Sequence, residues 1–273
     1  MQTGIVAQRN NPRAASLAGE LRDALVDRDV EVRIDESTAA ALDLSGSPIE
    51  TFDGCDLVVA IGGDGTLLFA ARNADGTPIL GVNLGEVGFL NAVPPEDAES
   101  AVLDAVGEFR ADDLSVREAS RLVARVDGWE SNPAANEIVI QGDRRGHGGG
   151  LEYAVRVDGS VYSESHADGV LVSTPTGSTA YNLSEGGPIV HPDLEIAVVN
   201  EMCARDGMPP FAVELDAEVV VSTTGSEPAI ITSDGREPRR FEGPVEVSIS
   251  RSETPLRIAG PQSDFFEALG KLS

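Results

Sequence analysis

The chain has 273 residues, enough for one large domain or two ordinary domains with buried cores. Acidic residues outnumber basic ones by 46 to 20, giving a formal net charge of −26. This charge disfavours a duplex nucleic-acid partner, because phosphate backbones are bound by basic patches. There is no unbroken apolar run of about 18 residues, and the N-terminus lacks the charged start and apolar middle of a signal peptide. We therefore expect no membrane partner and a cytoplasmic protein.

The lysine and cysteine content excludes several kinds of site. Lys271 is the only lysine, and it lies outside the motifs that place a lysine in a Walker A loop, a protein kinase or a pyridoxal enzyme. Cys55 and Cys203 are far apart and have no Cys or His neighbour at ligand spacing. We expect buried free thiols, and neither a disulfide framework nor a zinc site.

The first part of the chain reads as an open α/β domain. Apolar residues recur at helical spacing in residues 12–27, 67–72 and 95–109, while 56–61 is the continuous apolar run of a parallel strand covered on both faces. Further strands are predicted at 4–8, 30–34 and 79–82. The pattern predicts a Rossmann-like open sheet in an N-terminal domain of residues 1–110.

From about residue 115 the sequence changes to short alternating segments separated by Gly, Pro and Asp. Residues 122–126, 151–157 and 218–221 are the clearest of these predicted strands. We therefore expect a mainly-β domain at 111–255. Residues 146–150, which contain His147, are interpreted as a hairpin tip. Residues 256–273 are predicted to form a C-terminal helical tail that packs on the first domain, with the helix itself at 264–272.

The first chemical motif is Gly62-Gly63-Asp64-Gly65-Thr66, at the carboxyl end of a predicted buried strand. Ligands of open α/β sheets bind at that edge. Glycines let backbone N–H groups approach an anion, and a following helix adds its positive N-terminal dipole. The motif predicts a phosphate site at Gly62, Gly63, Gly65 and Thr66. The alternative is a glycine turn in which Asp64 merely caps a helix.

The second motif is the hydroxyl-rich run from Asp168 to Asn182, followed by Ser184 and Gly186-Gly187-Pro188. Five hydroxyl residues between Ser173 and Thr179 make a loop dense in donors and acceptors, suited to ribose hydroxyls and base edges. A Ser/Thr-rich turn that caps a helix is the alternative. Asn136-Glu137, at the entrance of a predicted strand, is a weaker candidate for the same kind of binding.

These motifs together resemble the NAD kinase family, in that family's order and approximate spacing. The resemblance rests on Gly62–Thr66, on Asn83-Leu84-Gly85 with Gly88-Phe89-Leu90, on Asn136-Glu137 and on Asp168–Tyr181 with Gly186-Gly187. The glycine motif is shared with phosphofructokinases and diacylglycerol kinases, whereas Thr174–Tyr181 is specific to NAD kinases. The excess of acidic residues and arginine is similar to that of proteins from salt-loving archaea.

The resemblance implies a role for each matching residue. Asp64 would be the catalytic carboxylate. The residues that would bind NAD are Asp64, Gly65, Asn136, Glu137, His147, His166, Asp168, Thr176, Thr179, Ala180, Tyr181, Asn182, Ser184 and Arg236. Because family members take some contacts from a neighbouring subunit, a homodimer or homotetramer is implied.

The predicted reaction is transfer of the terminal phosphoryl group of ATP, or of polyphosphate, to the 2′-hydroxyl of the adenosine ribose of NAD or NADH. Mg²⁺ or another divalent metal would offset the donor's charge. Two alternatives stay open. The acceptor could be a sugar phosphate or a lipid, or the chain could bind NAD(P) without catalysis.

Overall fold

The computed structural model describes residues 1–74, 76–85, 88–146 and 148–270. The chain divides into two compact units, one formed by Met1–Glu118 together with the chain from Leu256 onward, and one formed by Ala119–Pro255.

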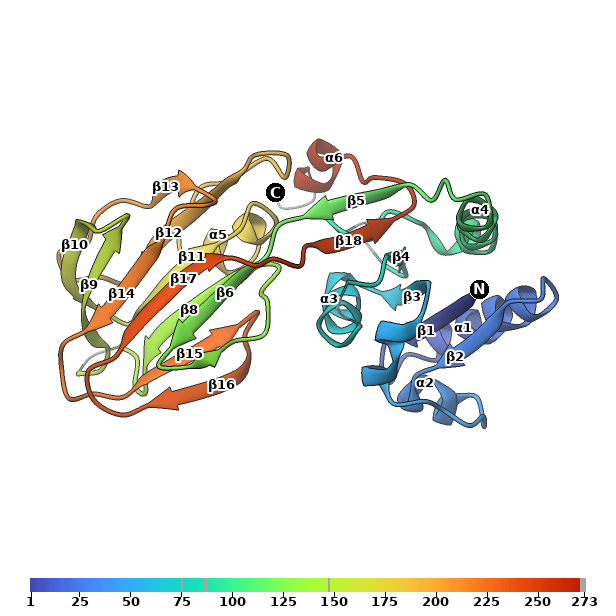
Figure 1. The fold of residues 1–273 in the computed structure, drawn as a ribbon, viewed down its shortest axis with the longest axis horizontal. Coiled ribbons are helices and arrows are strands. Elements are labelled where there is room, and N and C mark those ends of the chain that lie inside the picture. Colours follow the sequence, from blue (N-terminus) through green and yellow to red (C-terminus); the bar gives the residue numbers. More distant parts are fainter. Residues whose placement is uncertain (75, 86–87, 147, 271–273) are drawn as a thin grey trace. The chain divides into compact units, whose positions relative to one another are not determined.

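The first unit is built on a six-stranded sheet with the order β2-β1-β3-β4-β18-β5 (Figure 1). β1, β2, β3, β4 and β18 are parallel where they pair. Its strands are β1 (Gln2–Ala7), β2 (Glu31–Ile34), β3 (Leu57–Gly62), β4 (Ile79–Asn83), β5 (Val116–Ala119) and β18 (Leu256–Ala259). Its helices are α1 (Pro12–Val26), α2 (Glu36–Ala41), α3 (Asp64–Asn73), α4 (Ala98–Arg110) and α6 (Phe265–Leu269), with 3-10 turns at Ile49–Gly54 and Pro95–Asp97.

Both faces of this sheet are covered. One face packs under α1 and α4, whose buried residues form one core with alternate residues of β1, β3 and β4. The buried Phe52 contacts the other face at Gly4, where a Cβ atom would lie 2.5 Å from its ring. β3 is buried at every position, which confirms the expectation drawn from its continuous apolar run.

The C-terminal segment differs from its prediction. The closing helix is present as α6, with Asp264 capping its first turn by accepting the N–H groups of Phe266 and Glu267. The residues before it, predicted as part of a helical tail, form β18 between β4 and β5 in the sheet. β18 has four residues, of which Leu256, Ile258 and Ala259 are buried, and so short a segment does not indicate a strand from sequence alone.

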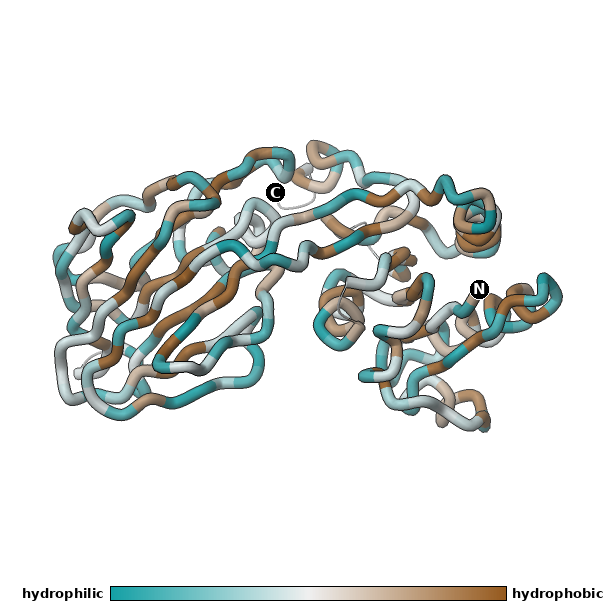
Figure 2. Tube along the Cα trace, in the orientation of Figure 1, coloured by the Kyte–Doolittle hydropathy of each residue, from teal (hydrophilic) through white to brown (hydrophobic). Residues whose placement is uncertain are grey.

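The second unit contains two six-stranded sheets, β10-β9-β14-β17-β6-β7 and β13-β12-β11-β8-β15-β16. Figure 2 shows brown apolar positions alternating with polar ones along these strands. The strands are β6 (Leu122–Val126), β7 (Trp129–Glu130), β8 (Glu137–Gly142), β9 (Leu151–Val157), β10 (Ser160–Ala167), β11 (Gly169–Ser173), β12 (Ile196–Met202), β13 (Phe211–Glu214), β14 (Val219–Thr223), β15 (Ala229–Ser233), β16 (Arg236–Phe241) and β17 (Glu246–Arg251). A 3-10 turn (Thr176–Thr179) and α5 (Tyr181–Ser184) follow β11.

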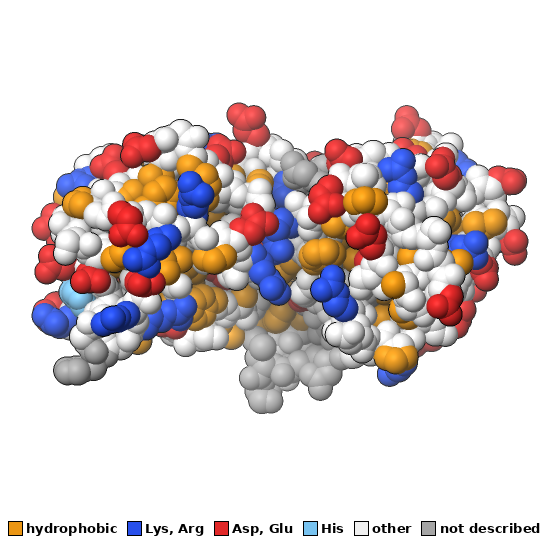
Figure 3. All heavy atoms as spheres, turned by 90° about the horizontal axis from the view of Figure 1, so that it is seen from below, with side chains coloured by type: hydrophobic (Ala, Val, Ile, Leu, Met, Phe, Trp, Pro, Cys, Tyr) orange, Lys and Arg blue, Asp and Glu red, His pale blue; other side chains and the backbone are white. Residues whose placement is uncertain are grey.

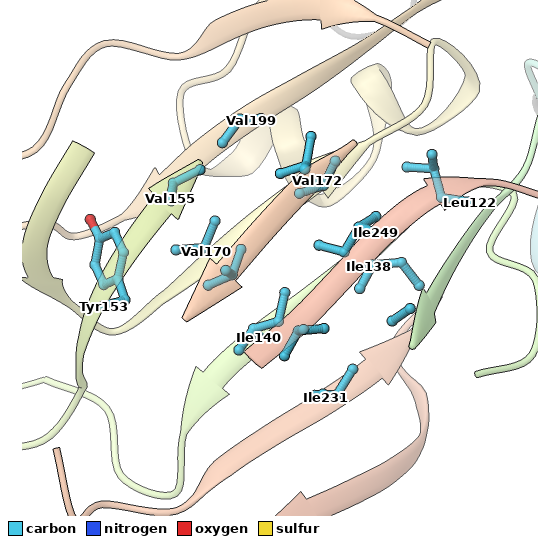
Figure 4. Close-up of a cluster of buried hydrophobic side chains, with 14 of the residues drawn as sticks. Leu122, Ile138, Ile140, Tyr153, Val155, Val170, Val172, Val199, Ile231 and Ile249 are labelled. Atoms are coloured by element: carbon cyan, nitrogen blue, oxygen red, sulfur yellow. The ribbon is translucent and has the colours of Figure 1, made fainter. Parts of the chain in front are cut away.

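A single apolar core joins the two sheets. Ile138, Ile140 and Val172 come from one sheet, and Val155 and Ile249 from the other (Figure 4). Two-residue Asp-Gly turns with positive φ at both positions close three hairpins, at Asp127-Gly128, Asp158-Gly159 and Asp234-Gly235. Such turns match the natural twist of paired strands.

The glycine-rich segment around residue 147 is not a hairpin tip, because it connects β8 to β9 and these strands belong to different sheets. Its glycines allow a close approach instead: a Cβ atom on Gly149 would lie 2.4 Å from the carbonyl oxygen of Arg144. On the face shown in Figure 3, acidic side chains are scattered among arginines, in keeping with a charge spread along the sequence.

Candidate active site

The glycine loop lies at the carboxyl end of β3, and α3 begins inside it at Asp64. Gly62 is buried, and a Cβ atom there would lie 2.4 Å from the hydroxyl of Thr66 and 3.0 Å from Gln8 Cβ. Gly63 and Gly65 face open space, with nothing within 4 Å of an added Cβ atom. The first N–H groups of a helix have no intrahelical acceptor, so the start of α3 presents donors beside an uncrowded backbone. This is the geometry of an anion site.

Asp64 does not cap its own helix, as the alternative interpretation of the motif required. Its carboxylate instead accepts three backbone N–H groups from the following loop: Phe89 to Oδ2 at 2.9 Å, and Leu90 and Asn91 each to Oδ1 at 3.2 Å. A Cβ atom on Gly88 would lie 2.1 Å from Asp64 Oδ1, so only glycine leaves room for this arrangement. The Gly88-Phe89-Leu90 segment therefore holds the carboxylate in one orientation.

Sequence reasoning missed Asn91, which ties the same loop to the glycine motif. Its side chain is buried, and its amide donates to the carbonyl oxygen of Gly62 at 3.0 Å. Gly81 on β4 makes the space, since a Cβ atom there would lie 2.1 Å from Asn91 Oδ1. A glycine in the middle of a buried strand was the signal that could have indicated a side chain packed against the strand.

In the second unit, much of the hydroxyl-rich loop is used for internal structure. Thr174 is buried; its hydroxyl donates to the carbonyl oxygen of Ala135 at 2.5 Å and accepts the N–H of Gly177 at 3.0 Å. A Cβ atom on Gly177 would lie only 2.0 Å from the carbonyl oxygen of Asn136. The loop is therefore fastened to the segment that carries Asn136 and Glu137. The helix-capping interpretation was wrong, because neither the 3-10 turn at Thr176–Thr179 nor α5 has a side-chain hydrogen bond at its N-cap.

Glu137, the first residue of β8, is the most unusual ionisable group of this region. Its side chain is 6% exposed, and among the described residues Oε2 has no hydrogen-bond partner. Its pKa is raised to about 8, chiefly by burial and then by the negative charge of Asp234, while a hydrogen bond from the Tyr181 backbone opposes the shift. A buried carboxyl oxygen without a partner in the chain is suited to a ligand hydroxyl or amide.

Asp234 is a second residue that sequence reasoning missed. It lies at the Asp234-Gly235 turn, and its carboxylate accepts the N–H groups of Ala135, Asn136 and Glu137 at 3.0, 2.7 and 3.2 Å. The turn is also held by the N–H of Asp234, which donates to the carbonyl oxygen of Glu137 at 3.0 Å. Asp234 thus fixes the backbone from which Asn136 and Glu137 project. The exposed Arg236, two residues after Asp234, begins β16 in the same hairpin.

Tyr181 and Asp168 are both connected to the loop between β8 and β9. Arg145 donates to the Tyr181 hydroxyl at 3.0 Å, and Asp168 Oδ1 accepts the N–H of Gly146 at 2.8 Å. Burial raises the pKa of the Tyr181 phenol. His166 is close by, since a Cβ atom on Gly150 would lie 2.8 Å from its ring. The structure therefore gathers Asp168, His166 and Tyr181 around this loop, whereas His147 lies outside the described residues.

The remaining predicted residues fall into two groups. Thr176, Thr179 and Ala180 are half-buried on the turn after β11, and Ser184 is exposed at the end of α5. Asn182 is fully buried, and its amide donates to the carbonyl oxygens of Ser178 and Pro188 at 3.2 and 3.0 Å. Asn182 is therefore placed to hold the turn together rather than to reach solvent.

Comparison with known proteins shows that the glycine loop of the first unit and the hydroxyl-rich loop of the second unit occur together in one protein family. The model of the ATP-NAD kinase N-terminal domain matches residues 3–108, which include the glycine loop. The model of the ATP-NAD kinase C-terminal domain matches residues 135–259, which include Glu137 and the hydroxyl-rich loop. The chain belongs to the NAD kinase family.

Relatives and solved structures agree over the full length. The NAD kinase of Halorubrum lacusprofundi is 58% identical and that of Halobacterium salinarum 53% identical, each with both chains covered completely. An Archaeoglobus fulgidus NAD kinase crystallised with ATP has a TM-score of 0.81 at 28% identity, covering 100% of this chain and 98% of its own. The yeast NADH kinase, crystallised with NADH, shares the fold with a TM-score of 0.85 at 21% identity, covering 100% of this chain and 87% of its own.

These comparisons confirm the resemblance drawn from the motifs, the α/β and mainly-β fold classes, and the similarity to halophilic archaeal proteins. Within the described ranges, no helix is both long and apolar enough to cross a membrane.

Proposed function

We propose that this chain transfers the terminal phosphoryl group of ATP to the 2′-hydroxyl of the adenosine ribose of NAD, giving NADP. Family membership supports the reaction, and the observation that carries the residue assignment is the Asp64 carboxylate, held by three backbone N–H groups beside the open glycine loop. A binding protein has no use for a carboxylate fixed beside a phosphate site, where the two charges repel.

In this reaction the ribose 2′-oxygen attacks the terminal phosphorus of the donor. The bond from that phosphorus to the bridging oxygen breaks, and ADP leaves with the bond's electron pair. Each carboxylate oxygen has two lone pairs. Among the described residues, Phe89 alone donates an N–H to Asp64 Oδ2, so this oxygen can also accept the proton of the 2′-hydroxyl. The N–H groups around Gly63 and Gly65 are proposed to hold the transferred phosphate, with Gly62 and Thr66 shaping the loop.

A divalent metal such as Mg²⁺ is proposed as the cofactor. Mg²⁺ usually binds through phosphates, water and one or two carboxylates rather than an all-protein cage. The remaining lone pair of Asp64 Oδ2 is assigned to the 2′-hydroxyl and Oδ1 already accepts two N–H groups, so the ion would be held by the donor's phosphates and by water. When bound, the ion would supply neutralisation of the charge on the donor's phosphates.

The second unit is proposed to bind the dinucleotide. Glu137 Oε2, buried and without a partner in the described chain, would receive a ribose hydroxyl or the nicotinamide amide. Asn136, His166, Asp168, Thr176, Thr179, Ala180, Tyr181, Ser184 and Arg236 are proposed as further contacts, and Asn182 as the residue that shapes the turn. The same chemistry admits NADH. A homodimer or homotetramer in the cytoplasm is part of the proposal, and sedimentation velocity in molar KCl tests the assembly.

Asp64→Asn tests the assignment. The variant should lose about 10²- to 10⁴-fold in kcat, the usual contribution of a general base, while still binding NAD. Asparagine has one acceptor oxygen, so it can keep the bonds to Leu90 and Asn91 and leave the Phe89 N–H unpaired, at a cost of about 1–3 kcal/mol of stability. Thermal unfolding therefore accompanies the assay of NADP formation. Asp23→Asn, on the exposed side of α1, is the control. Full activity in Asp64→Asn would refute the role given to this carboxylate.

A further inference from the structure

The C-terminal helix α6 lies beside the loop that holds Asp64. β18 pairs with β4 in parallel, with Ala259 opposite Leu80, so the two strands end at the same edge of the sheet (Figure 1). The chain that leaves β4 forms the loop at residues 88–91, and the chain that leaves β18 forms α6. The parallel pairing therefore brings the last helix of the chain to the edge that carries the glycine loop.

An aromatic pair joins α6 to this loop. The rings of Phe265 on α6 and Phe89 in the loop have centroids 5.8 Å apart, and their planes are tilted by 55°. This separation lies within the range of about 4.5–7 Å over which tilted aromatic rings attract each other. Both residues are half-buried. The pair is thus a tertiary contact through which α6 fixes the position of Phe89.

The backbone of Phe89 contacts the reactive oxygen of the site. Its N–H donates to Asp64 Oδ2 at 2.9 Å, and Oδ2 is the oxygen to which the proton of the 2′-hydroxyl is assigned. Gly88, the preceding residue, has no side chain with which to anchor the loop. A shift of Phe89 would therefore move the donor that orients Oδ2.

The two donors to the other oxygen, Oδ1, are anchored by burial. Leu90 and Asn91 donate to Oδ1, and they are only 5% and 0% exposed. The Asn91 amide also donates to the carbonyl oxygen of Gly62 at 3.0 Å. Phe89 is only half-buried, and its ring lies against Phe265. The orientation of Oδ2 therefore depends on α6 more than the orientation of Oδ1 does.

α6 is itself held in place by contacts with the rest of the chain. It has five residues, and so short a helix is not stable in isolation. Asp264 caps its first turn, and Ala268 is 2% exposed. The ring of Phe266, which is 72% exposed, lies 5.7 Å from that of Phe265 with a tilt of 73°. Phe265 thus contacts one ring on the loop and another on its own helix.

We propose that Phe265 is a positioning residue for phosphoryl transfer, acting through Phe89 on Asp64 Oδ2. The inference rests on the proposed function, because it takes Asp64 as the acceptor of the 2′-hydroxyl proton. A displacement of about 1 Å at a reacting group costs up to about 10²-fold in rate. Loss of the contact should therefore lower kcat, while the affinity for the substrates is kept because Phe265 is not among their proposed contacts.

The first test compares Phe265→Ala with Phe211→Ala in steady-state assays of NADP formation in molar KCl. Phe211 is the matched control, because its ring stacks on that of Tyr162 at 4.9 Å in the second unit, so its loss removes an aromatic pair outside the site. Phe265→Ala should lower kcat about tenfold and keep KM for NAD and for ATP within about twofold, whereas Phe211→Ala should keep kcat within about twofold. Phe265→Tyr keeps the ring and should restore kcat to within about twofold of the unmodified chain.

Amide hydrogen exchange tests the contact without requiring activity. Phe265→Ala should speed exchange of the Phe89 amide about 2- to 10-fold, the factor that corresponds to the loss of one aromatic pair. Exchange in β6, in the second unit, should stay unchanged. The double variant Phe89→Ala/Phe265→Ala should have the kcat of Phe89→Ala alone, because both substitutions remove the same contact.

An unchanged kcat in Phe265→Ala would overturn the proposal, as would an equal loss in Phe211→Ala or losses that multiply in the double variant. Should Phe265→Ala fail to fold, Phe265→Leu, which keeps an apolar side chain without the ring, takes its place, and the same outcomes decide. If the unmodified chain makes no NADP, the proposed function fails. Unchanged exchange at Phe89 in an active chain refutes the positioning role alone.

Discussion

Glu137→Gln should make the protein more stable at high pH, by an amount that grows between pH 4.5 and 8. The pKa of Glu137 is raised from 4.5 to about 8, chiefly by burial and then by Asp234. Throughout that window the folded state keeps a proton that the unfolded state has released, so stability falls as the pH rises. The contribution of the neutral form is fully present below pH 4.5 and is lost above pH 8.

The size of this change in the free energy of unfolding follows from the difference between the unfolded and folded pKa values of Glu137. Each pH unit in which the two states differ by one proton changes the free energy of unfolding by about 1.4 kcal/mol, so the full effect reaches up to about 5 kcal/mol. Glutamine has nearly the same shape and no titrating proton, so the variant lacks this dependence. Glu137 is buried, so molar salt should screen its charge little.

Denaturant unfolding in molar KCl at pH 5, 6.5 and 8.5 measures the free energy of unfolding of the variant and of the unmodified chain. The free-energy gap between Glu137→Gln and the unmodified chain should widen steadily across the three values. Glu164→Gln, at an exposed position of β10, serves as the control and should show a constant gap. A constant gap for Glu137→Gln would mean that Glu137 is already ionised in the folded protein, and the argument from burial would be refuted.

Two glycines should resist substitution for different reasons. Gly88→Ala places a methyl group 2.1 Å from Asp64 Oδ1 and should displace the carboxylate. The variant should therefore lose more than tenfold in kcat while keeping its affinity for NAD. An unchanged kcat would contradict the fixed position of the Asp64 carboxylate. Gly177→Ala collides with the Asn136 carbonyl oxygen at 2.0 Å and should cost about 1–3 kcal/mol of stability, measured by thermal unfolding. Gly107→Ala, on α4 with open space around it, is the control for both and should be neutral or stabilising by up to about 1 kcal/mol. A Gly177→Ala variant as stable as the unmodified chain would refute the close contact.

Much of the first unit could be predicted because its signals are local. β3 is apolar at every buried position, and α1 repeats its apolar residues at helical spacing. The glycine loop was recognisable because the motif itself requires close backbone approach. The hydrogen-bond donors to Asp64 could not be predicted. They are backbone N–H groups 25 to 27 residues away, and every residue type except proline has such a group.

In the second unit, the strands could be predicted from the sequence, but the roles of its polar residues could not. The alternating strands were evident, but the division of the hydroxyl-rich run into structural and available side chains depends on burial, which residue type does not reveal. Thr174 and Asn182 have buried side chains that are hydrogen-bonded within the chain, whereas Thr176 is half-buried and Ser184 is exposed. Asp234 was hidden in an Asp-Gly hairpin turn, a signal that predicts the turn but not the three N–H groups its carboxylate accepts.

The position of β18 has a consequence for how the protein is made. This strand lies between β4 and β5, yet it is synthesised about 140 residues after β5. On the ribosome, the sheet that carries the glycine loop must wait with an unpaired edge on β4 while the whole second unit emerges, and a strand edge left exposed is a site for aggregation. Release of a chain shortened before Leu256 should therefore yield an intact second unit attached to an incomplete phosphate-binding sheet. Completion of the sheet that carries the glycine loop therefore depends on a strand that is synthesised after the second unit.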